Sequence, residues 1–175
     1  MRPITRIHII RIMKLSDGVE WGLHCCTLLA LLPADAALPA ARMAEFHGVP
    51  AAYLAKHLQA LSRAGIVEAG AGPRGGYRLA RPPADITVLD VVEAIEGRAP
   101  AFRCTEIRQR GPASLPAREY RVACTITASM HRAEEAWRAE LRSETIGDLV
   151  QSLATSAHPK AVAKAADWFQ EVLRT

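Results

Sequence analysis

The strongest indication of the fold is in residues 40–81, AARMAEFHGVPAAYLAKHLQALSRAGIVEAGAGPRGGYRLAR. Residues 40–46 and 51–64 have helical character and are separated by HGVP, which predicts two short helices around a glycine turn. Residues 66–69 and 77–80 are strand candidates, and the glycines between them suit the tip of a hairpin. A hairpin that follows a helix-turn-helix is a wing, so the sequence predicts a winged helix-turn-helix.

Further helices are expected on both sides of this unit. A first helix begins at Ser16 and ends before Pro33, and a short helix over 88–95 follows the wing. Residues 98–120 are interrupted by proline and glycine and predict an irregular loop. A long helix and a last helix over 160–173 come next, and the long helix carries one apolar stripe that needs a partner, formed by Ile126, Met130, Ala133, Trp137 and Leu141. The last helix carries Val162, Ala166, Phe169 and Leu173 on one side.

Length and composition agree with a small helical protein. The chain has 175 residues, of which 50% are apolar and only 5% aromatic, which favours one mainly α domain with an appended arm. Its net charge of +4 permits a nucleic-acid partner without requiring one. The longest apolar run, residues 25–33, is too short to span a bilayer. With no secretory leader recognised upstream of its cysteines, we expect a cytoplasmic protein without a membrane partner.

Basic and hydrogen-bonding side chains gather on the second helix of the motif and on the wing, and residues 71–81 contain no acid. Such side chains can meet phosphates and base edges, and a wing arginine suits a narrow minor groove. A solvated charged face is the alternative interpretation. The candidate DNA contacts are Ala52, Tyr53, Lys56, His57, Gln59, Arg74 and Arg78.

Five segments, taken in order, resemble the winged-helix transcription regulators that include IscR and NsrR: residues 13–16 (MKLS), 53–59 (YLAKHLQ), 64–67 (AGIV), 75–81 (GGYRLAR) and 90–97 (DVVEAIEG). The resemblance extends from residue 13 to about residue 153. It implies a homodimer that binds double-stranded DNA at an inverted-repeat operator, with the long helix crossing its twin. It also implies a transcriptional regulator, expected to be a repressor, rather than an enzyme, and the sequence contains no recognised nucleophile motif.

The cysteines depart from the pattern common in that family, which places three cysteines close together in the loop. This chain has Cys104 and then Cys124, with nineteen residues between them. Two thiolates cannot fill the four protein-ligand positions of a [2Fe-2S] cluster, so other residues must complete a cluster site. Glu20 and His24 are candidates, because residues four apart on a helix share a face with their Cβ atoms roughly 5–6 Å apart.

Residues 18–26, GVEWGLHCC, together with the wide cysteine pair, resemble the RsrR-type redox-sensing branch of the family. That resemblance implies a [2Fe-2S] cluster held between subunits, with Glu20 and His24 of one chain and Cys104 and Cys124 of the other as its metal ligands. Operator binding is then expected to depend on the redox state of the cluster. Carboxylate and imidazole ligands in place of thiolates should raise its potential and couple its reduction to proton uptake.

Other interpretations of these residues stay open. Cys104 and Cys124 can act without a cluster as a thiol switch, or the same four residues can bind zinc. Glu20 can be a solvated helix residue and His24 a hydrogen-bonded one. Adjacent helical residues diverge by about 100°, so we expect one of Cys25 and Cys26 in the core and the other at most near the site.

These observations divide the chain into five expected parts. They are a basic N-terminal extension at 1–12, a winged helix-turn-helix DNA-binding domain at 13–97, a cluster-binding loop at 98–123, a dimerisation helix region at 124–153 and a C-terminal helical extension at 154–175. The extension at 1–12 is either loosely ordered, the product of an over-long start assignment, or a basic arm against DNA.

Overall fold

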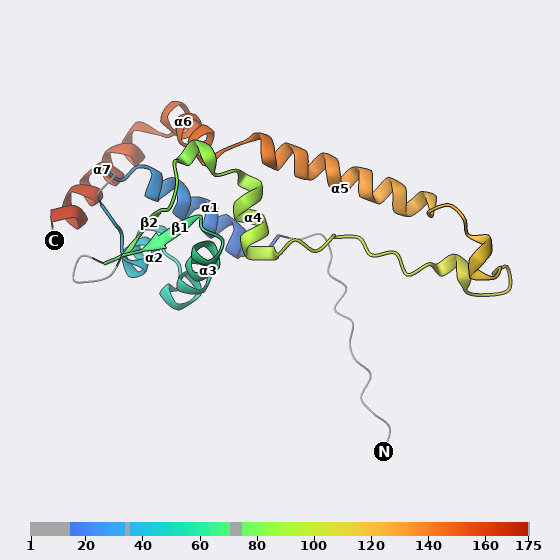
Figure 1. Ribbon diagram of the computed structural model, residues 1–175. Coiled ribbons are helices and arrows are strands. Elements are labelled where there is room, and N and C mark those ends of the chain that lie inside the picture. Colours follow the sequence, from blue (N-terminus) through green and yellow to red (C-terminus); the bar gives the residue numbers. More distant parts are fainter. Residues whose placement is uncertain (1–14, 34–35, 71–74, 175) are drawn as a thin grey trace, which may run out of the picture.

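A computed structural model describes residues 15–33, 36–70 and 75–174, so the extension at 1–12 and Arg74 lie outside the described residues. The strands are β1 (Val67–Ala69) and β2 (Tyr77–Leu79), and short 3-10 turns are η1 (Pro83–Asp85), η2 (Ile107–Gln109) and η3 (Ala117–Glu119). The mainly α fold with one small hairpin is confirmed (Figure 1). The helices are α1 (Asp17–Ala30), α2 (Ala40–His47), α3 (Ala51–Arg63), α4 (Val88–Glu96), α5 (Thr125–Ser143), α6 (Ile146–Ser156) and α7 (Pro159–Arg174).

Helices α2 and α3 form the helix-turn-helix. Gly48 ends α2 in the left-handed region at φ 64°, a conformation that strains residues with a side chain. Along α3, Leu54, Leu58 and Leu61 are fully buried at helical spacing, and they anchor α3 to the core. The opposite side of α3 is therefore left on the surface.

The wing is anchored on both edges of β2. On one edge β2 pairs antiparallel with β1, with Val67 opposite Leu79. On the other edge Tyr77 exchanges two backbone hydrogen bonds of 2.9 Å with Leu38, in the segment between α1 and α2. These bonds hold the base of the hairpin against the helix-turn-helix.

Helix α1 lies in the centre of the domain. It contacts α3, α4 and α6, so it is enclosed over more than one face. As a result Cys25 and Cys26 are both completely buried, and the prediction that only one of them belongs to the core is wrong. Neither thiol is available to a site on the surface.

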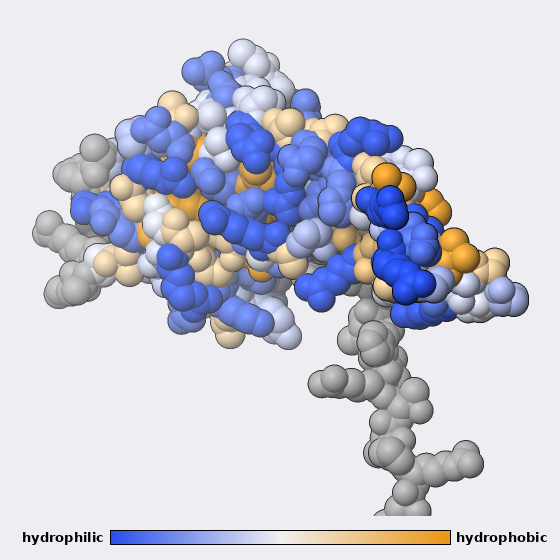
Figure 2. Space-filling view, turned by 45° about the vertical axis from the view of Figure 1, so that its right-hand side comes forward, coloured by the Kyte–Doolittle hydropathy of each residue, from blue (hydrophilic) through white to orange (hydrophobic). Residues whose placement is uncertain are grey.

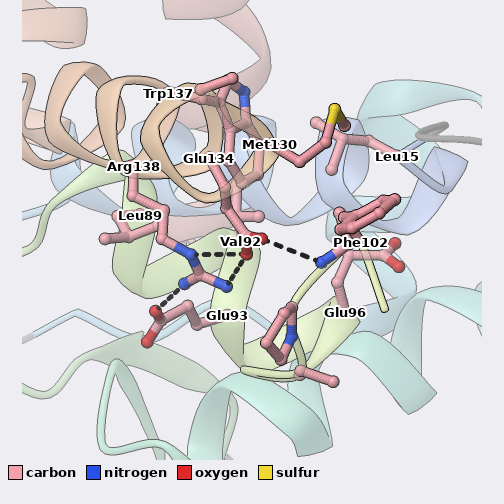
Figure 3. Close-up of a pocket in the computed structure, with 15 residues that line it drawn as sticks. Leu15, Leu89, Val92, Glu93, Glu96, Phe102, Met130, Glu134, Trp137 and Arg138 are labelled. Atoms are coloured by element: carbon pink, nitrogen blue, oxygen red, sulfur yellow. Dashed lines mark hydrogen bonds and ion pairs between the residues drawn. The ribbon is translucent and has the colours of Figure 1, made fainter. Parts of the chain in front are cut away.

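Helix α5 and the segment before it leave the domain together as an arm (Figure 1). With 19 residues, α5 is about 28 Å long. Its root is fastened to α4 by Arg138, which binds Glu93 at 2.6 Å and Glu134 at 3.1 Å, beside a cavity of about 310 Å³ (Figure 3). Glu134 in turn accepts a hydrogen bond from the backbone amide of Ala101, at 3.2 Å. The arm is therefore tied to the DNA-binding domain through partly buried charge pairs.

The apolar stripe of α5 is shared between the chain itself and the surface. Trp137 and Leu141 pack against Val19, Val88 and Val92 within the same chain, so the prediction that the whole stripe awaits a partner is wrong for this half. The opposite end of the stripe stays exposed. In the described residues, no helix combines the length and the apolarity that spanning a bilayer requires.

After the arm, the chain returns to the DNA-binding domain. Thr87 and Thr145 form an isolated bridge, and each begins a helix with a reciprocal capping box. Helix α6 then packs on α1 and η1, so it lies against the DNA-binding domain.

Helix α7 covers the end of α2 with an aromatic cluster. The ring of Phe46 lies 4.7 Å from that of Trp168 and 6.2 Å from that of Phe169, measured between centroids. The buried side of α7 is thus rotated from the expected one, since Val162 and Leu173 are 52% and 42% exposed. The cluster joins the C-terminal helix to the helix-turn-helix.

Candidate functional site

The surface of α3 carries most of the predicted DNA contacts. Ala52, Tyr53, Lys56 and Gln59 are all exposed, and Tyr53 is 64% exposed. Their exposure follows from the burial of the leucines on the opposite side of the helix. The helix therefore presents an ammonium, an amide and a phenol to a partner, and the residues that carry them share one element.

His57 differs from the other candidates on α3. Its ring packs edge-on against Trp21 of α1, with centroids 5.9 Å apart. A Cβ placed on Gly18 would overlap the His57 ring, so α1 needs a glycine here to let the imidazole approach. His57 is half-buried between α1 and α3, and the structure places it at a joint between helices.

Arg78 lies on the wing in an ion pair. Its Nε is 2.6 Å from Oε1 of Glu68, the residue directly opposite on β1, and both side chains are 50% exposed. The net positive charge of the wing is thus smaller than the absence of acids in residues 71–81 suggests. This pair was missed in the sequence analysis, although the hairpin register places positions 68 and 78 opposite each other.

Neutralising Glu68 is expected to strengthen DNA binding. In Glu68→Gln, Arg78 loses its ion pair and is released toward phosphate, so the plot of log affinity against log salt should steepen by about 0.9. Affinity at low salt should rise several-fold, as measured by fluorescence anisotropy across a salt series. Glu135→Gln, the same charge change on α5, is the control. Equal shifts in both variants would exclude a phosphate contact by Arg78.

On α1, Glu20 and His24 are both exposed and lie one helical turn apart. The ring of His24 is 5.5 Å from that of His47 at the end of α2. Burial, together with the nearby His24, lowers the pKa of His47 and favours its neutral form. The Nε2 of His47 is buried without a hydrogen-bond partner among the described residues. This half of the candidate site thus offers a carboxylate and an imidazole on an exposed face.

The two loop cysteines lie at the other end of the molecule, and they share a site. Cys104 is exposed, Cys124 is half-buried, and both line an open cavity of about 320 Å³. Cys124 precedes the first turn of α5, where the backbone amides of Thr127 and Ile126 hydrogen bond to its sulfur and lower the pKa of the thiol. The positive charge of Arg108 adds to this effect. The geometry favours a thiolate at Cys124.

The four cysteines are expected to react unequally with an alkylating reagent. Burial raises the pKa of Cys25 to about 12 and also raises that of Cys26, whereas the pKa of Cys124 is lowered. Because only the thiolate attacks, iodoacetamide at pH 7 should modify Cys124 first, then Cys104, and leave the other two untouched. Peptide mass spectrometry of a reduced, metal-free sample measures this order. Early modification of Cys25 or Cys26 in folded protein would contradict the described core.

The structure brings the predicted ligands together as two pairs and not as four. One pair is on α1 inside the domain, and the other flanks the segment that contains η2 and η3, at the far end of the arm (Figure 1). Consistent with this, no group of three or more His, Cys, Asp or Glu side chains in the described part of the chain is close enough to hold a metal ion. A four-ligand site of these residues requires a second chain.

Two charged residues beside the cysteines were not anticipated from the sequence. Glu106 and Arg108 form an ion pair of 2.6 Å and line the cavity of Cys104 and Cys124. The sequence does contain a hint of this pair, because an acidic and a basic residue follow Cys104 at alternate positions. That spacing alone does not distinguish a local pair from two solvated side chains.

Known proteins resemble this chain over most of its length. The model of the Rrf2 family, described as an iron-dependent transcriptional regulator, matches residues 15–152. The putative HTH-type transcriptional regulator YwgB of Bacillus subtilis (strain 168) is 31% identical over 134 residues, which cover 77% of this chain and 82% of YwgB. Protein aau3 of Rhizobium meliloti (strain 1021) is 36% identical over 110 residues, or 63% of this chain and 68% of aau3.

Solved structures share the fold. CymR of B. subtilis, a global cysteine regulator, has a TM-score of 0.59 at 23% identity and covers 81% of this chain and 98% of its own. IscR of T. potens has a TM-score of 0.62 at 22% identity, with coverages of 86% and 96%. Rrf2 regulators are homodimers that bind DNA. The chain belongs to the Rrf2 family and is a DNA-binding transcriptional regulator.

Proposed function

We propose that two copies of this chain hold a [2Fe-2S] cluster between them, and that the redox state of the cluster controls repression at an inverted-repeat operator. The observation that carries this proposal is the division of the candidate ligands into two separate pairs. Glu20 and His24 belong to the DNA-binding domain, and Cys104 and Cys124 belong to the arm. Each pair alone is half of a four-ligand site, and a second chain supplies the missing half.

The donor atoms suit the cluster. Two sulfurs at the edge of one cavity, one of them with a lowered pKa, supply the thiolates that iron-sulfur clusters bind. The exposed carboxylate and imidazole on α1 supply harder ligands. When bound, the cluster supplies one-electron redox chemistry at a potential that its ligands set.

The exposed surface of the arm supports a second copy as the partner. The tip carries large apolar side chains on its surface, and apolar patches lie beside hydrophilic ones there (Figure 2). Such side chains in a soluble fold are commonly buried against another chain. These side chains, with their exposed fractions, are Ile107 (70%), Leu115 (58%), Val122 (76%) and Ile126 (65%).

A symmetric pair explains both operator recognition and control. A two-fold axis repeats α3 and the wing, so the pair matches an inverted repeat. Two crossed arms carry the cysteines of each chain to the domain of the other. Because one ligand pair is fixed to the domain and the other to the arm, any change in how they bind biases the orientation of the two α3 helices. Arg138 transmits that bias, since it ties the arm to α4.

The experiment that tests this function is anaerobic purification followed by visible absorption and by iron and sulfide quantitation, before and after dithionite. We expect a coloured protein with iron and sulfide in equal amounts, which bleaches on reduction, and whose affinity for a promoter fragment changes with it. A protein that stays colourless and free of sulfide after reconstitution would exclude the cluster. Iron without sulfide, or zinc, would also contradict it.

A thiol switch without a cluster is the second candidate. It is favoured by one observation, namely that Cys104 and Cys124 line the same cavity while the pKa of Cys124 is lowered. In this case oxidation joins the two sulfurs in a disulfide, with loss of two protons and two electrons to an added oxidant such as oxidised glutathione. DNA binding would then respond to oxidised glutathione in iron-free protein and would be insensitive to dithionite after iron loading.

A further inference from the structure

We propose that Arg108 is a positioning residue that holds Cys104 and Cys124 as one ligand pair and directs an N–H donor and a positive charge toward the group that they bind. This inference rests on the proposed function and names the residue of the arm that prepares the cysteine half of the shared site. The Arg108 side chain lines the same cavity as both cysteines.

Arg108 is connected to Cys104 through Glu106. Its Nη2 donates to Oε2 of Glu106 at 2.6 Å, while Oε1 of the same carboxylate accepts from the Cys104 thiol at 3.3 Å. The amide of Glu106 also donates to the Cys104 sulfur at 3.4 Å. Among the described residues, Glu106 is the one non-glycine residue with a positive φ, at 48°. The strained backbone of Glu106 is thus found where it joins the sulfur to the guanidinium.

Arg108 is connected to Cys124 through the segment of the loop that returns toward α5. Its Nη2 donates to the carbonyl of Val122, two residues before Cys124, at 3.4 Å. Its Cζ lies 4.9 Å from the ring centroid of Tyr120, within the range of a cation–π contact. The Tyr120 hydroxyl donates back to the Arg108 carbonyl at 2.5 Å. One side chain therefore links the two segments that carry the cysteines.

A donor of Arg108 remains without a partner. Its Nε is shielded from solvent and makes no hydrogen bond to any described residue, although the Arg108 side chain as a whole is 30% exposed. A buried donor without a partner is costly, and functional sites are where such groups persist. A sulfide or thiolate acceptor bound beside the cysteines would satisfy this N–H.

The charge of Arg108 predicts the direction of its effect on redox behaviour. Two thiolates on one cavity repel each other, and a guanidinium beside them offsets that repulsion. Adding an electron to the bound group increases the negative charge, so a fixed positive charge favours the reduced form and raises the reduction potential. Arginine stays protonated throughout the accessible pH range, so this contribution does not vary with pH.

The test compares Arg108→Gln, Arg108→Lys and the control Arg110→Gln. Arg110 is two residues away and donates to the Thr105 carbonyl at 3.3 Å. Its variant therefore removes the same charge from the same loop. The first readout uses metal-free, reduced protein and phenylarsine oxide, which captures only two thiols held close together. The second is the midpoint potential of reconstituted protein, followed by visible absorption. Circular dichroism checks that each variant retains its helices.

Wild-type protein should bind the arsenical completely through Cys104 and Cys124. Cys25 and Cys26 should not react, because both are buried. Arg108→Gln should bind the arsenical several-fold more slowly than wild type, and its midpoint potential should be lower. Arg108→Lys keeps the charge but not the fork of donors, so it should restore the midpoint potential more fully than the rate of arsenical binding. Arg110→Gln should match wild type in both readouts. Wild-type capture and potential in Arg108→Gln would overturn the inference.

The two readouts separate this inference from the function on which it rests. A wild-type protein that binds no iron and sulfide would contradict the proposed function, while arsenical capture would still test whether Arg108 holds the cysteines together. A cluster that loads with equal potential in all variants would instead overturn the role of Arg108 and leave the proposed function intact.

Discussion

A mixed dimer of one Glu20→Ala/His24→Ala chain and one Cys104→Ala/Cys124→Ala chain is expected to hold a single cluster, although neither double variant holds a cluster alone. The reason is the separation of the two ligand pairs by the length of the arm (Figure 1). In the mixed dimer one shared site has lost all four ligands, and the other retains all four. Sites built within one chain would be damaged in both partners.

Co-expression of the two variants with different affinity tags, followed by tandem purification, isolates the mixed dimer. Iron and sulfide per dimer should reach half of the value for wild-type chains carrying the same two tags. Each doubly mutated homodimer should be colourless yet retain its helical circular dichroism, since all four side chains lie outside the core. A mixed dimer without iron would contradict ligands shared between chains.

Gly76→Ala is expected to detach the wing from the domain. A Cβ at Gly76 would lie 2.5 Å from the carbonyl carbon and 2.8 Å from the carbonyl oxygen of Leu38. These are backbone atoms held by the two hydrogen bonds between Leu38 and Tyr77, so they cannot move aside as a flexible side chain would. Crowding of this kind costs about 1–3 kcal/mol of unfolding free energy. Specific DNA affinity should fall with it, because the wing loses its anchored edge.

Urea denaturation and operator titration measure the two effects. The matched control is Gly70→Ala on the same hairpin, where the nearest atom to a new Cβ is the Gly76 carbonyl oxygen at an ordinary 3.8 Å. Gly70→Ala should change the unfolding free energy by less than about 0.5 kcal/mol, as is typical of surface sites. Equal stability of the two variants would show that the described contact between Gly76 and Leu38 is not tight.

Much of the fold follows from local sequence signals. The spacing of Leu54, Leu58 and Leu61 predicts which side of α3 is buried, and Gly48 predicts the turn before it, because both effects act within a few residues. Hairpin glycines and helix caps act over the same short range. The same is true of the pairing of Glu20 with His24 on one helical face, which needs only the helical repeat.

Other features depend on contacts between distant segments. Periodicity places Cys25 and Cys26 about 100° apart and cannot show that three helices surround α1 and bury both. The same limit applies to Trp137, which packs on α4 within its own chain although its stripe is typical of a dimer helix. In both cases the number of neighbours around a helix decides burial, and this number is a property of the assembled domain.

Local sequence signals predict the winged helix-turn-helix, because short-range backbone preferences encode its helices and turns. The set of four candidate ligands follows from the family resemblance, and helical spacing supports its Glu20 and His24 pair. The separation of these candidates into two pairs depends on the tertiary structure, since the distance between α1 and the tip of the arm depends on where α5 leaves the domain. The contacts by which Arg108 links the two segments that carry Cys104 and Cys124 also depend on the tertiary structure, because a loop folds back on itself through hydrogen bonds and ring contacts that no periodic pattern specifies.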